Sequence, residues 1–221
     1  MPYLPYLVLI SNHPQLAIWF QVVKDASPVK SGIMLLPMVI AILVASVSSG
    51  YAITYMGYYI MLMIPAGFIT VGGAIMMIYF EKDTPAKFWI PALALLGFGI
   101  GLGISGPFLA VQAILPERDT SVGLAIMTFS QEFGTALSLG VAQCLFLNGL
   151  RASITRITPE LNPESIINAG ATSLAGSGLE KYASQIAEEY SQALKVTFDL
   201  SLGMAVLVVV TGCFMEVRSV K

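Results

Sequence analysis

Long apolar stretches, separated by short polar breaks, run along most of this 221-residue chain. A helix needs about 20 consecutive, mostly apolar residues to cross a membrane. Five stretches reach that length, and we predict a transmembrane helix over each of them. They are Ile33–Met56, Tyr58–Phe80, Phe88–Leu115, Ser121–Leu147 and Val196–Met215. The breaks between them hold glycine, proline and charged residues, which are typical of helix ends.

The region before Ile33 departs from this pattern. Residues 3–23 are apolar overall, but the polar run Ser11–Gln15 interrupts them and contains Pro14. Proline lacks a backbone donor and clashes with the preceding turn, so we do not expect a regular full span here. Leu16–Val23 is predicted to be the end of a span whose first half is missing or replaced. The prediction is therefore an all-α, polytopic membrane protein with five to six transmembrane helices.

One long polar connection, Asn148–Leu194, follows the fourth predicted helix. Its last part, Leu179–Leu194, has apolar residues at helical spacing. This spacing predicts a short amphipathic helix, which either lies on the membrane or on the protein, or is a solvated helix without a specific role. The chain then divides into a partial first span and loop (1–32), four membrane helices (33–147), a polar loop (148–194), and a last helix and tail (195–221).

Composition supports placement in a membrane. Hydrophobic residues make up 56% of the chain and charged residues only 11%, whereas soluble domains carry about 25% charged residues. The mean hydropathy is +0.79. Such a chain has too few charges to cover a globular surface and belongs in a lipid bilayer. Its net charge of −2 and its scattered Lys and Arg residues offer no basic surface for a nucleic acid.

The predicted spans lack the residue arrangements of an enzyme. Cys144 and Cys213 lie singly inside apolar stretches, and His13 has no cysteine or acidic cluster near it in the sequence. Zinc normally needs three or four such ligands, so we expect no metal site. The spans contain no nucleophile with a base, no paired carboxylates and no phosphate-binding loop. We therefore expect neither an enzyme nor a cofactor.

Polar side chains line one face of the fourth predicted helix, with Glu132 near its middle. A charge at bilayer depth is costly and usually persists only where it faces a bundle interior or a watery path. The 3.6-residue period places polar or small residues on one face of this helix and apolar residues on the other. The polar face holds Ser121, Thr128, Gln131, Glu132, Thr135, Ser138 and Ala142, and the apolar face holds Val122, Ile126, Phe129, Phe133, Leu137, Val141 and Cys144.

Two interpretations of this polar face remain open. In the first, its side chains line a substrate or proton path, and the candidate residues are Thr128, Gln131, Glu132, Thr135, Ser138 and, near the end of the third helix, Gln112. In the second, the uncharged members bond neighbouring helices and Glu132 faces water at a wide vestibule. Because Glu132 shares its face with Thr128 and Thr135, we expect it to point into the bundle, away from lipid.

Glycines recur along the third predicted helix, at Gly97, Gly99, Gly101, Gly103 and Gly106. Two pairs have the four-residue spacing that lets helix backbones approach closely in lipid. Since Gly97/Gly101 and Gly99/Gly103 fall on different faces, we predict close packing against more than one neighbour. The spacing is common in apolar helices and says nothing about a substrate. Pro107 follows and is predicted to kink this helix.

Several segments resemble a known family. Leu16–Lys24 and Ser31–Pro37 look like the start of the C-terminal half of a major facilitator transporter. Ile114–Ala125 and Met127–Leu137 resemble the loop and helix at the penultimate span of the fourteen-span drug:proton antiporters. Met215–Lys221 is similar to the tails of the fungal toxin-efflux branch. The resemblance covers roughly Leu16 to Lys221, and the joint order of these motifs is fairly specific.

The resemblance implies a proton-driven exporter of hydrophobic small molecules, such as toxins or drugs, in the plasma membrane or a vacuolar membrane. Its partners would be the lipid bilayer, the substrate, protons and a missing N-terminal half. This chain would be the last five to six of fourteen spans and would not transport alone. The alternative, from another class, is a non-transporting membrane subunit that regulates a partner transporter.

The chain also departs from the family pattern. Residues 50–59 stand where facilitators have a glycine-rich basic loop, yet they hold no Arg or Lys. Ile104–Phe108 stands where the family usually has a glutamine-containing stretch. Glu132 replaces a residue that is commonly uncharged, so its role cannot be carried over from the family.

The resemblance places both termini in the cytosol and the loop at 148–194 outside it. The positive-inside rule, applied to this chain, gives the opposite orientation. Three cations lie on the terminal side, whereas eight lie on the other: Lys24, Lys30, Lys82, Lys87, Arg151, Arg156, Lys181 and Lys195. We follow the resemblance, because an orientation set by spans upstream of this chain would leave such a bias behind.

Overall fold

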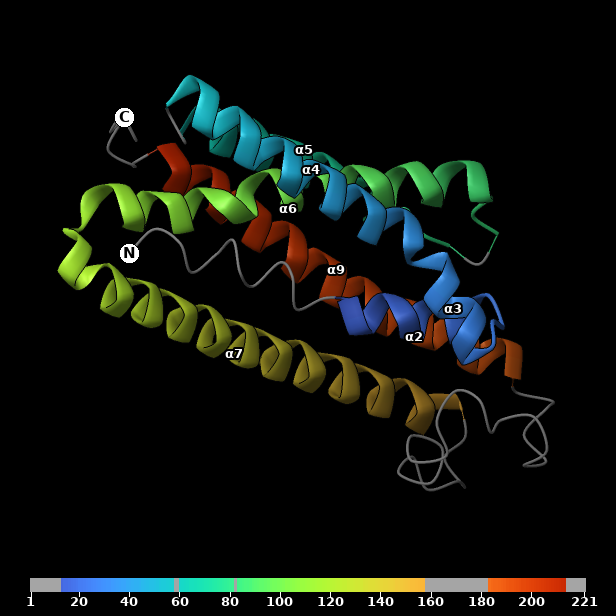
Figure 1. The fold of residues 1–221 in the computed structure, drawn as a ribbon. Coiled ribbons are helices and arrows are strands. Elements are labelled where there is room, and N and C mark those ends of the chain that lie inside the picture. Colours follow the sequence, from blue (N-terminus) through green and yellow to red (C-terminus); the bar gives the residue numbers. More distant parts are fainter. Residues whose placement is uncertain (1–12, 58–59, 82, 158–182, 214–221) are drawn as a thin grey trace.

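The computed structural model describes residues 13–57, 60–81, 83–157 and 183–213. The described part consists of helices joined by short turns (Figure 1). The helices are α2 (His13–Val23), α3 (Pro28–Met34), α4 (Leu36–Met56), α5 (Ile60–Ile78), α6 (Ala86–Ile114), α7 (Glu117–Ile157) and α9 (Ala183–Cys213). This architecture confirms the all-α prediction.

Four helical segments of the described chain are long and apolar enough to cross a membrane. They are Pro28–Tyr55, Met61–Ile78, Ala86–Gln112 and Glu117–Thr155, and they correspond to the first four predicted spans. The predicted fifth span lies within α9 as far as Cys213. The predicted half-span Leu16–Val23 lies within α2, and residues 1–12 before it are outside the described part.

The bounds of the long polar connection differ from the prediction. α7 continues ten residues past Leu147, and α9 already begins at Ala183. The helix continues because Leu150 and Ile154 repeat the four-residue spacing of Phe146, and all three are buried. Of the predicted amphipathic helix, residues 179–182 lie outside the described part, and the rest is the first part of α9. Because residues 148–157 and 183–194 are mostly polar, the sequence predicted a loop at positions where the structure has helix.

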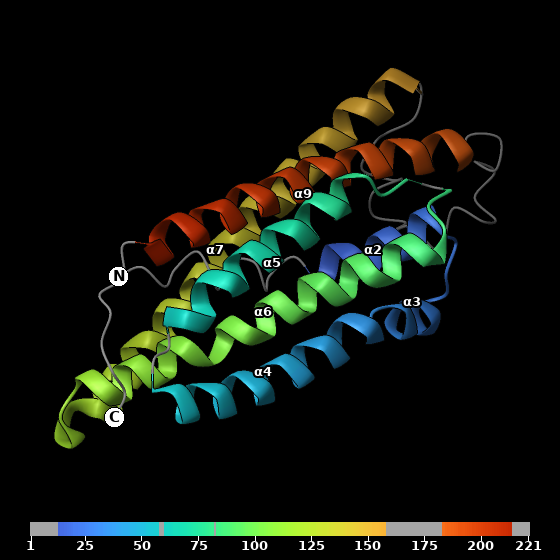
Figure 2. The same ribbon diagram turned by 90° about the horizontal axis from the view of Figure 1, so that it is seen from above.

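α6 is the central helix of one layer, with α4 along one side of it and α5 along another (Figure 2). Its glycines make this contact close, because a Cβ atom has no room at three of them. At Gly97 and Gly101 the obstacle is the backbone of α4, at the carbonyls of Met38 and Ile42, whereas at Gly99 it is Thr70 of α5.

The approach of α5 to α6 is close from both sides. A Cβ atom on Gly73 of α5 would lie 2.7 Å from the backbone nitrogen of Leu96, and one on Gly106 would lie 2.9 Å from the sulfur of Met63. Gly103 is buried as well. Pro91 and Pro107 both lie inside α6. Backbone contacts at Gly73, Gly97, Gly99 and Gly101 therefore lock the layer formed by α4, α5 and α6.

Buried aromatic rings tie α2, α5, α6 and α9 together at one end of the bundle. The ring of Phe80, just after α5, lies 5.1 Å from Trp19 of α2 and 6.4 Å from Phe198 of α9, centroid to centroid. Phe20 of α2 lies 5.0 Å from Trp89 of α6. Edge-to-face and tilted pairs at these distances are favourable. Far-apart parts of the chain therefore share one core at this end.

The opposite end of the bundle holds the end of α4 and the turn between α6 and α7 (Figure 1). Gly57 ends α4 in the left-handed region, with φ of 79°, and its N–H donates to the Ile53 carbonyl at 2.8 Å. Only glycine adopts this conformation freely, and it is the common helix stop. The break at residue 57, between the first two predicted spans, is therefore an actual helix end.

Candidate functional site

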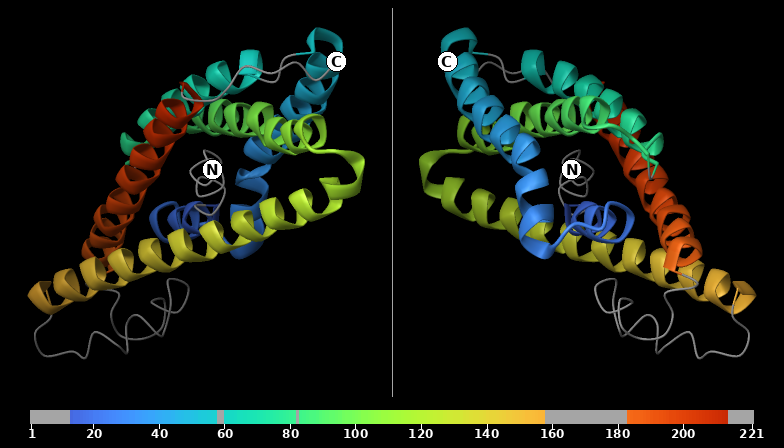
Figure 3. Two further views of the ribbon diagram at one scale, coloured as in Figure 1. Left: turned by 90° about the vertical axis from the view of Figure 1, so that its left-hand side faces the viewer. Right: turned by 90° about the vertical axis from the view of Figure 1, so that its right-hand side faces the viewer.

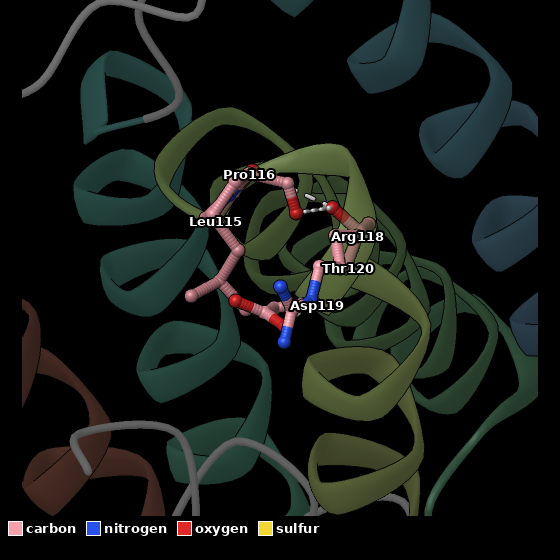
Figure 4. Close-up of polar contacts among 5 residues, drawn as sticks. All are labelled: Leu115, Pro116, Arg118, Asp119 and Thr120. Atoms are coloured by element: carbon pink, nitrogen blue, oxygen red, sulfur yellow. Dashed lines mark hydrogen bonds and ion pairs between the residues drawn. The ribbon is translucent and has the colours of Figure 1, made fainter.

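The candidate site is built on α7 and begins at the turn that leads into it from α6. Leu115 leaves α6 with extended backbone, and its N–H donates to the Val111 carbonyl at 3.1 Å. The backbone N–H of Asp119 donates to the carbonyl of Pro116 at 2.8 Å, and the Thr120 hydroxyl donates to the same carbonyl at 3.0 Å (Figure 4). These bonds fix the direction in which α7 leaves the turn.

Close packing reinforces this turn. A Cβ atom on Gly123 would collide with the side chain of Leu115 and lie 3.0 Å from Val111. The charged residues of the turn are solvent-exposed, and Arg118 lies 3.9 Å from the Asp119 carboxylate. An exposed pair at that distance contributes little. The motif at 114–125, singled out by sequence, is therefore a rigid helix–turn–helix held mainly by backbone and hydroxyl contacts.

α7 touches the rest of the described bundle along one narrow edge. It meets α6 at the turn and α9 toward its own C-terminal end, while its middle stands apart from α4 and α5 (Figure 3). The edge is made of residues that are buried: Met127, Gly134, Ser138, Ala142, Phe146, Leu150 and Ile154. The remaining circumference of the helix is open for most of its length.

The polar candidates of α7 do not all share one environment. Ser138 is buried and donates its hydroxyl to the Thr135 carbonyl at 3.1 Å. Gln131 and Thr135 are half-buried, whereas Thr128 and Glu132 are exposed. The polar stripe thus runs from the packed edge to the open side of α7. Glu132, which we expected to point into the bundle, is exposed, so the described helices do not bury it.

Gln112 lies near the end of α6 and is exposed. It precedes the turn, whereas the stripe begins after the turn at Ser121. The described contacts therefore bring Thr135 and Ser138 together but leave Gln112 apart from them.

The apolar face of α7 is open as well. Val122, Ile126, Phe133, Leu137 and Val141 are each more than half exposed, and Phe129 is 70% exposed. The rings of Phe129 and Phe133 stack, with centroids 6.0 Å apart and an interplanar angle of 13°. This face suits lipid or another apolar surface, as sequence periodicity predicts.

Polar contacts at the aromatic end of the bundle could not be foreseen from sequence, because they join residues far apart in the chain. The Lys24 ammonium donates to the Thr84 carbonyl at 2.8 Å and lies 5.7 Å from the Trp19 ring centroid. Desolvation lowers the pKa of Lys24, while the nearby Asp83 carboxylate opposes that shift. Lys195 of α9 lies 3.6 Å from Glu81. The only sequence signal was the placement of these charges at predicted helix ends.

Within the part of the chain that the structure describes, no group of three or more His, Cys, Asp or Glu side chains is placed to hold a metal ion. The geometry of α7 instead offers a long helix with a packed edge, a polar stripe and an exposed apolar face. Such a helix suits a wall of a passage through a membrane.

Comparisons with known proteins find fungal transporters. The chain is 36% identical over 206 residues to the MFS-type efflux pump MFS1 of Trichophyton rubrum, covering 93% of this chain and 38% of that protein. It is 34% identical over 216 residues to the efflux pump roqT of Penicillium rubens, covering 98% of this chain and 40% of the relative. Over most of its length, this chain is therefore similar to proteins named as transporters of the MFS type.

A third relative is the MFS acetylaranotin efflux transporter ataA of Aspergillus terreus, 42% identical over 159 residues, which cover 72% of this chain and 35% of that transporter. No family model matches the chain. The chain spans less than half the length of these relatives. All three are named as efflux pumps or transporters rather than as enzymes, in agreement with the apolar helices of the fold.

Proposed function

We propose that this chain forms the C-terminal part of a proton-coupled efflux transporter for hydrophobic small molecules of the toxin class. The observation that carries the proposal is the match to named efflux transporters over 93% of the chain. Two relatives are named for the molecules that they export, the acetylaranotin efflux transporter of Aspergillus terreus and a thioclapurine efflux transporter of Claviceps purpurea. Either the plasma membrane or a vacuolar membrane would suit such an exporter.

Facilitator transporters bind their substrate between two halves near the bilayer midplane and rock one half against the other. In this chain the locked layer of α4, α5 and α6 supplies the rigid support of one half. The open side of α7 supplies polar groups at membrane depth, namely Thr128, Gln131, Glu132 and Thr135. A single half offers one wall, so we propose that the chain transports only together with the remainder of a longer transporter.

The orientation in this proposal puts the α6–α7 turn in the cytosol and residues 158–182 outside it. The family resemblance supports this orientation. The end of α4 and the α6–α7 turn lie at the same end of the bundle (Figure 1). This is consistent with helices that cross a membrane in alternating directions.

Replacement of the matching C-terminal segment of the acetylaranotin transporter by this chain tests the proposal. In an A. terreus strain that lacks its own transporter, the chimera should lower the acetylaranotin retained in the cells, and a protonophore should abolish the effect. This chain expressed alone should leave retention at the level of the empty vector. A chimera that reaches the membrane in normal amounts but exports nothing would contradict the proposal.

A further inference from the structure

Three energetically unfavourable features of the described chain lie close together, between Trp19 in α2 and Asp25 just after it. Trp19 is fully buried, and its indole N–H is the one buried side-chain polar group among the described residues without a hydrogen-bond partner. Asp25 is the one described residue other than glycine with a positive φ, at 50°, a conformation that costs most residues free energy. Burial lowers the pKa of Lys24, because its ammonium gives up part of its hydration. Strain of this kind tends to collect at segments that change conformation.

Two kinds of contact hold α2 in place against these costs. The rings of Trp19 and Phe20 are fully buried in the aromatic cluster that α2 shares with α5, α6 and α9. The Lys24 ammonium donates to the Thr84 carbonyl at 2.8 Å, across 60 residues of chain, and lies 5.7 Å from the Trp19 ring centroid. A hydrogen bond from a charged donor is stronger than one from a neutral group. Lys24 therefore fastens the end of α2 to the turn between α5 and α6.

The turn that receives Lys24 is held in shape without α2. Thr84 is buried, and its hydroxyl accepts a hydrogen bond from the Glu81 backbone N–H at 2.7 Å. The Thr84 N–H donates in return to the Glu81 carbonyl at 3.0 Å, and the Glu81 carboxylate lies 3.6 Å from Lys195 of α9. The Thr84 carbonyl should therefore keep its place when α2 moves away from it.

α2 and α3 are joined into one corner by contacts of their own (Figure 1). The side-chain amide of Gln21 in α2 donates to the hydroxyl of Ser31 in α3 at 3.1 Å. The Ala26 N–H donates to the Phe20 carbonyl at 3.2 Å, and the Ser27 hydroxyl caps α3 by accepting from the backbone N–H of the residue three positions later. The two short helices should therefore move as a single body.

The helix is interrupted where this corner meets α4. Leu35 ends α3 and precedes α4, and Pro37 lies in the first turn of α4. Proline has no N–H to continue the helical hydrogen bonds, and kinks in helices usually have such a cause. A Cβ atom on Gly32 would meet nothing within 4 Å, so there is open space beside α3. Because α4 itself is wedged against α6, bending should take place at Leu35–Pro37.

We propose that the corner of α2 and α3 is a latch that swings at Leu35–Pro37 and is caught by the hydrogen bond from Lys24 to the Thr84 carbonyl. In the docked state the aromatic rings are buried and the catch is closed. In the released state the Trp19 N–H and the Lys24 ammonium regain polar partners, and Asp25 leaves its positive φ. These opposing terms keep two discrete states within reach of each other. The latch belongs to this chain by itself, so it goes beyond the proposed function and does not depend on transport.

The distance between the corner and the α5–α6 turn tests this proposal. Spin labels are placed on cysteines at Lys30→Cys in α3 and Lys87→Cys at the start of α6, two exposed positions outside the catch. Cys144 and Cys213 are replaced by serine, and the full chain is studied in nanodiscs by double electron–electron resonance. We expect one main distance for the docked state and a minor, longer distance for the released state.

Substitutions then shift the ratio of released to docked chains. Lys24→Met keeps the length and the apolar stem but leaves the Thr84 carbonyl without its charged donor, and should raise the ratio about tenfold. Asp25→Gly, added to Lys24→Met, should lower the ratio again by about fivefold, because glycine adopts a positive φ freely. Lys195→Met is the matched control. It removes an ammonium that faces the same turn from α9, and it should leave the ratio unchanged.

A single distance in both the unsubstituted chain and Lys24→Met would overturn the proposal. So would an equal rise in Lys195→Met, or a Lys24→Met variant that melts earlier without populating the longer distance, because a purely structural contact behaves in that way. Asp25→Gly alone should also lower the released fraction. This variant decides the matter where Lys24→Met does not fold, and an unchanged or raised ratio in it contradicts the latch.

Discussion

α6 and α7 are consecutive helices joined by one tight turn, yet α6 is mostly packed against other helices and α7 is mostly exposed. The apolar window of α6 is 56% buried within this chain, whereas that of α7 is 28% buried. α6 uses glycines to bring two neighbouring backbones against it, those of α4 and α5. α7 presents a charge, hydroxyls and stacked rings on a side that the described helices leave open. The difference teaches that, in this chain, α6 holds the packed layer together, whereas α7 leaves polar and aromatic side chains exposed.

We expect the largest effect on stability from removing a buried aromatic ring of the core, compared with removing an exposed ring of α7. Phe80→Ala empties a fully buried site between Trp19 and Phe198, and should cost about 3 kcal/mol of stability. Phe129→Ala, at an exposed position, should cost less than about 0.5 kcal/mol. Thermal unfolding of both variants in the same nanodiscs checks this, and equal losses would contradict the contrast between the packed core and the exposed face of α7.

The same substitution on the two helices sharpens the comparison. Gly101→Ala forces a methyl group against the α4 backbone at Ile42, and should destabilise by about 2 kcal/mol. Gly140→Ala on α7 meets nothing within 4 Å, and should be neutral or slightly stabilising because alanine favours helix. Melting temperatures give the readout. A Gly101→Ala variant as stable as Gly140→Ala would show that the layer of α4, α5 and α6 is not locked.

The turn between the helices should show a smaller effect. Thr120→Val keeps the shape of the side chain but removes the hydroxyl that donates to the Pro116 carbonyl, so we expect a loss of about 1 kcal/mol. Thr128→Val, at an exposed position on α7, is the matched control and should leave stability unchanged. If Thr120→Val melts at the original temperature, the backbone hydrogen bonds alone hold the turn.

The smallest effect is expected at the Lys195–Glu81 ion pair. Its carboxylate side is largely exposed, and exposed pairs contribute little and are screened by salt. Lys195→Met should change stability by less than about 0.5 kcal/mol. Unfolding measured at low and at high ionic strength checks this, and a loss of more than about 1 kcal/mol would place the pair among the main contacts between α9 and the layer.

Sequence was sufficient for the helical type and the approximate places of the first four predicted spans, because apolar length is the dominant constraint on a span. It also indicated the glycine faces of α6, since four-residue spacing maps directly onto helix faces. Sequence could not give the end of α7. Leu150 and Ile154 continue its buried stripe, but their neighbours are polar, and the low hydropathy of that segment indicated a loop. The direction of Glu132 was likewise beyond reach, because one helix period does not say which face meets the bundle.

The backbone contacts of Gly97, Gly99 and Gly101 also have a mechanical consequence. A helix wedged between two others at backbone distance has no soft side-chain layer that could absorb sliding or rotation. α4, α5 and α6 should then behave as a single stiff plate, so that any rearrangement of a longer transporter moves them together. Distances between spin labels on α4 and α6 should stay constant through the working cycle, and displacement should be recorded between this plate and α7.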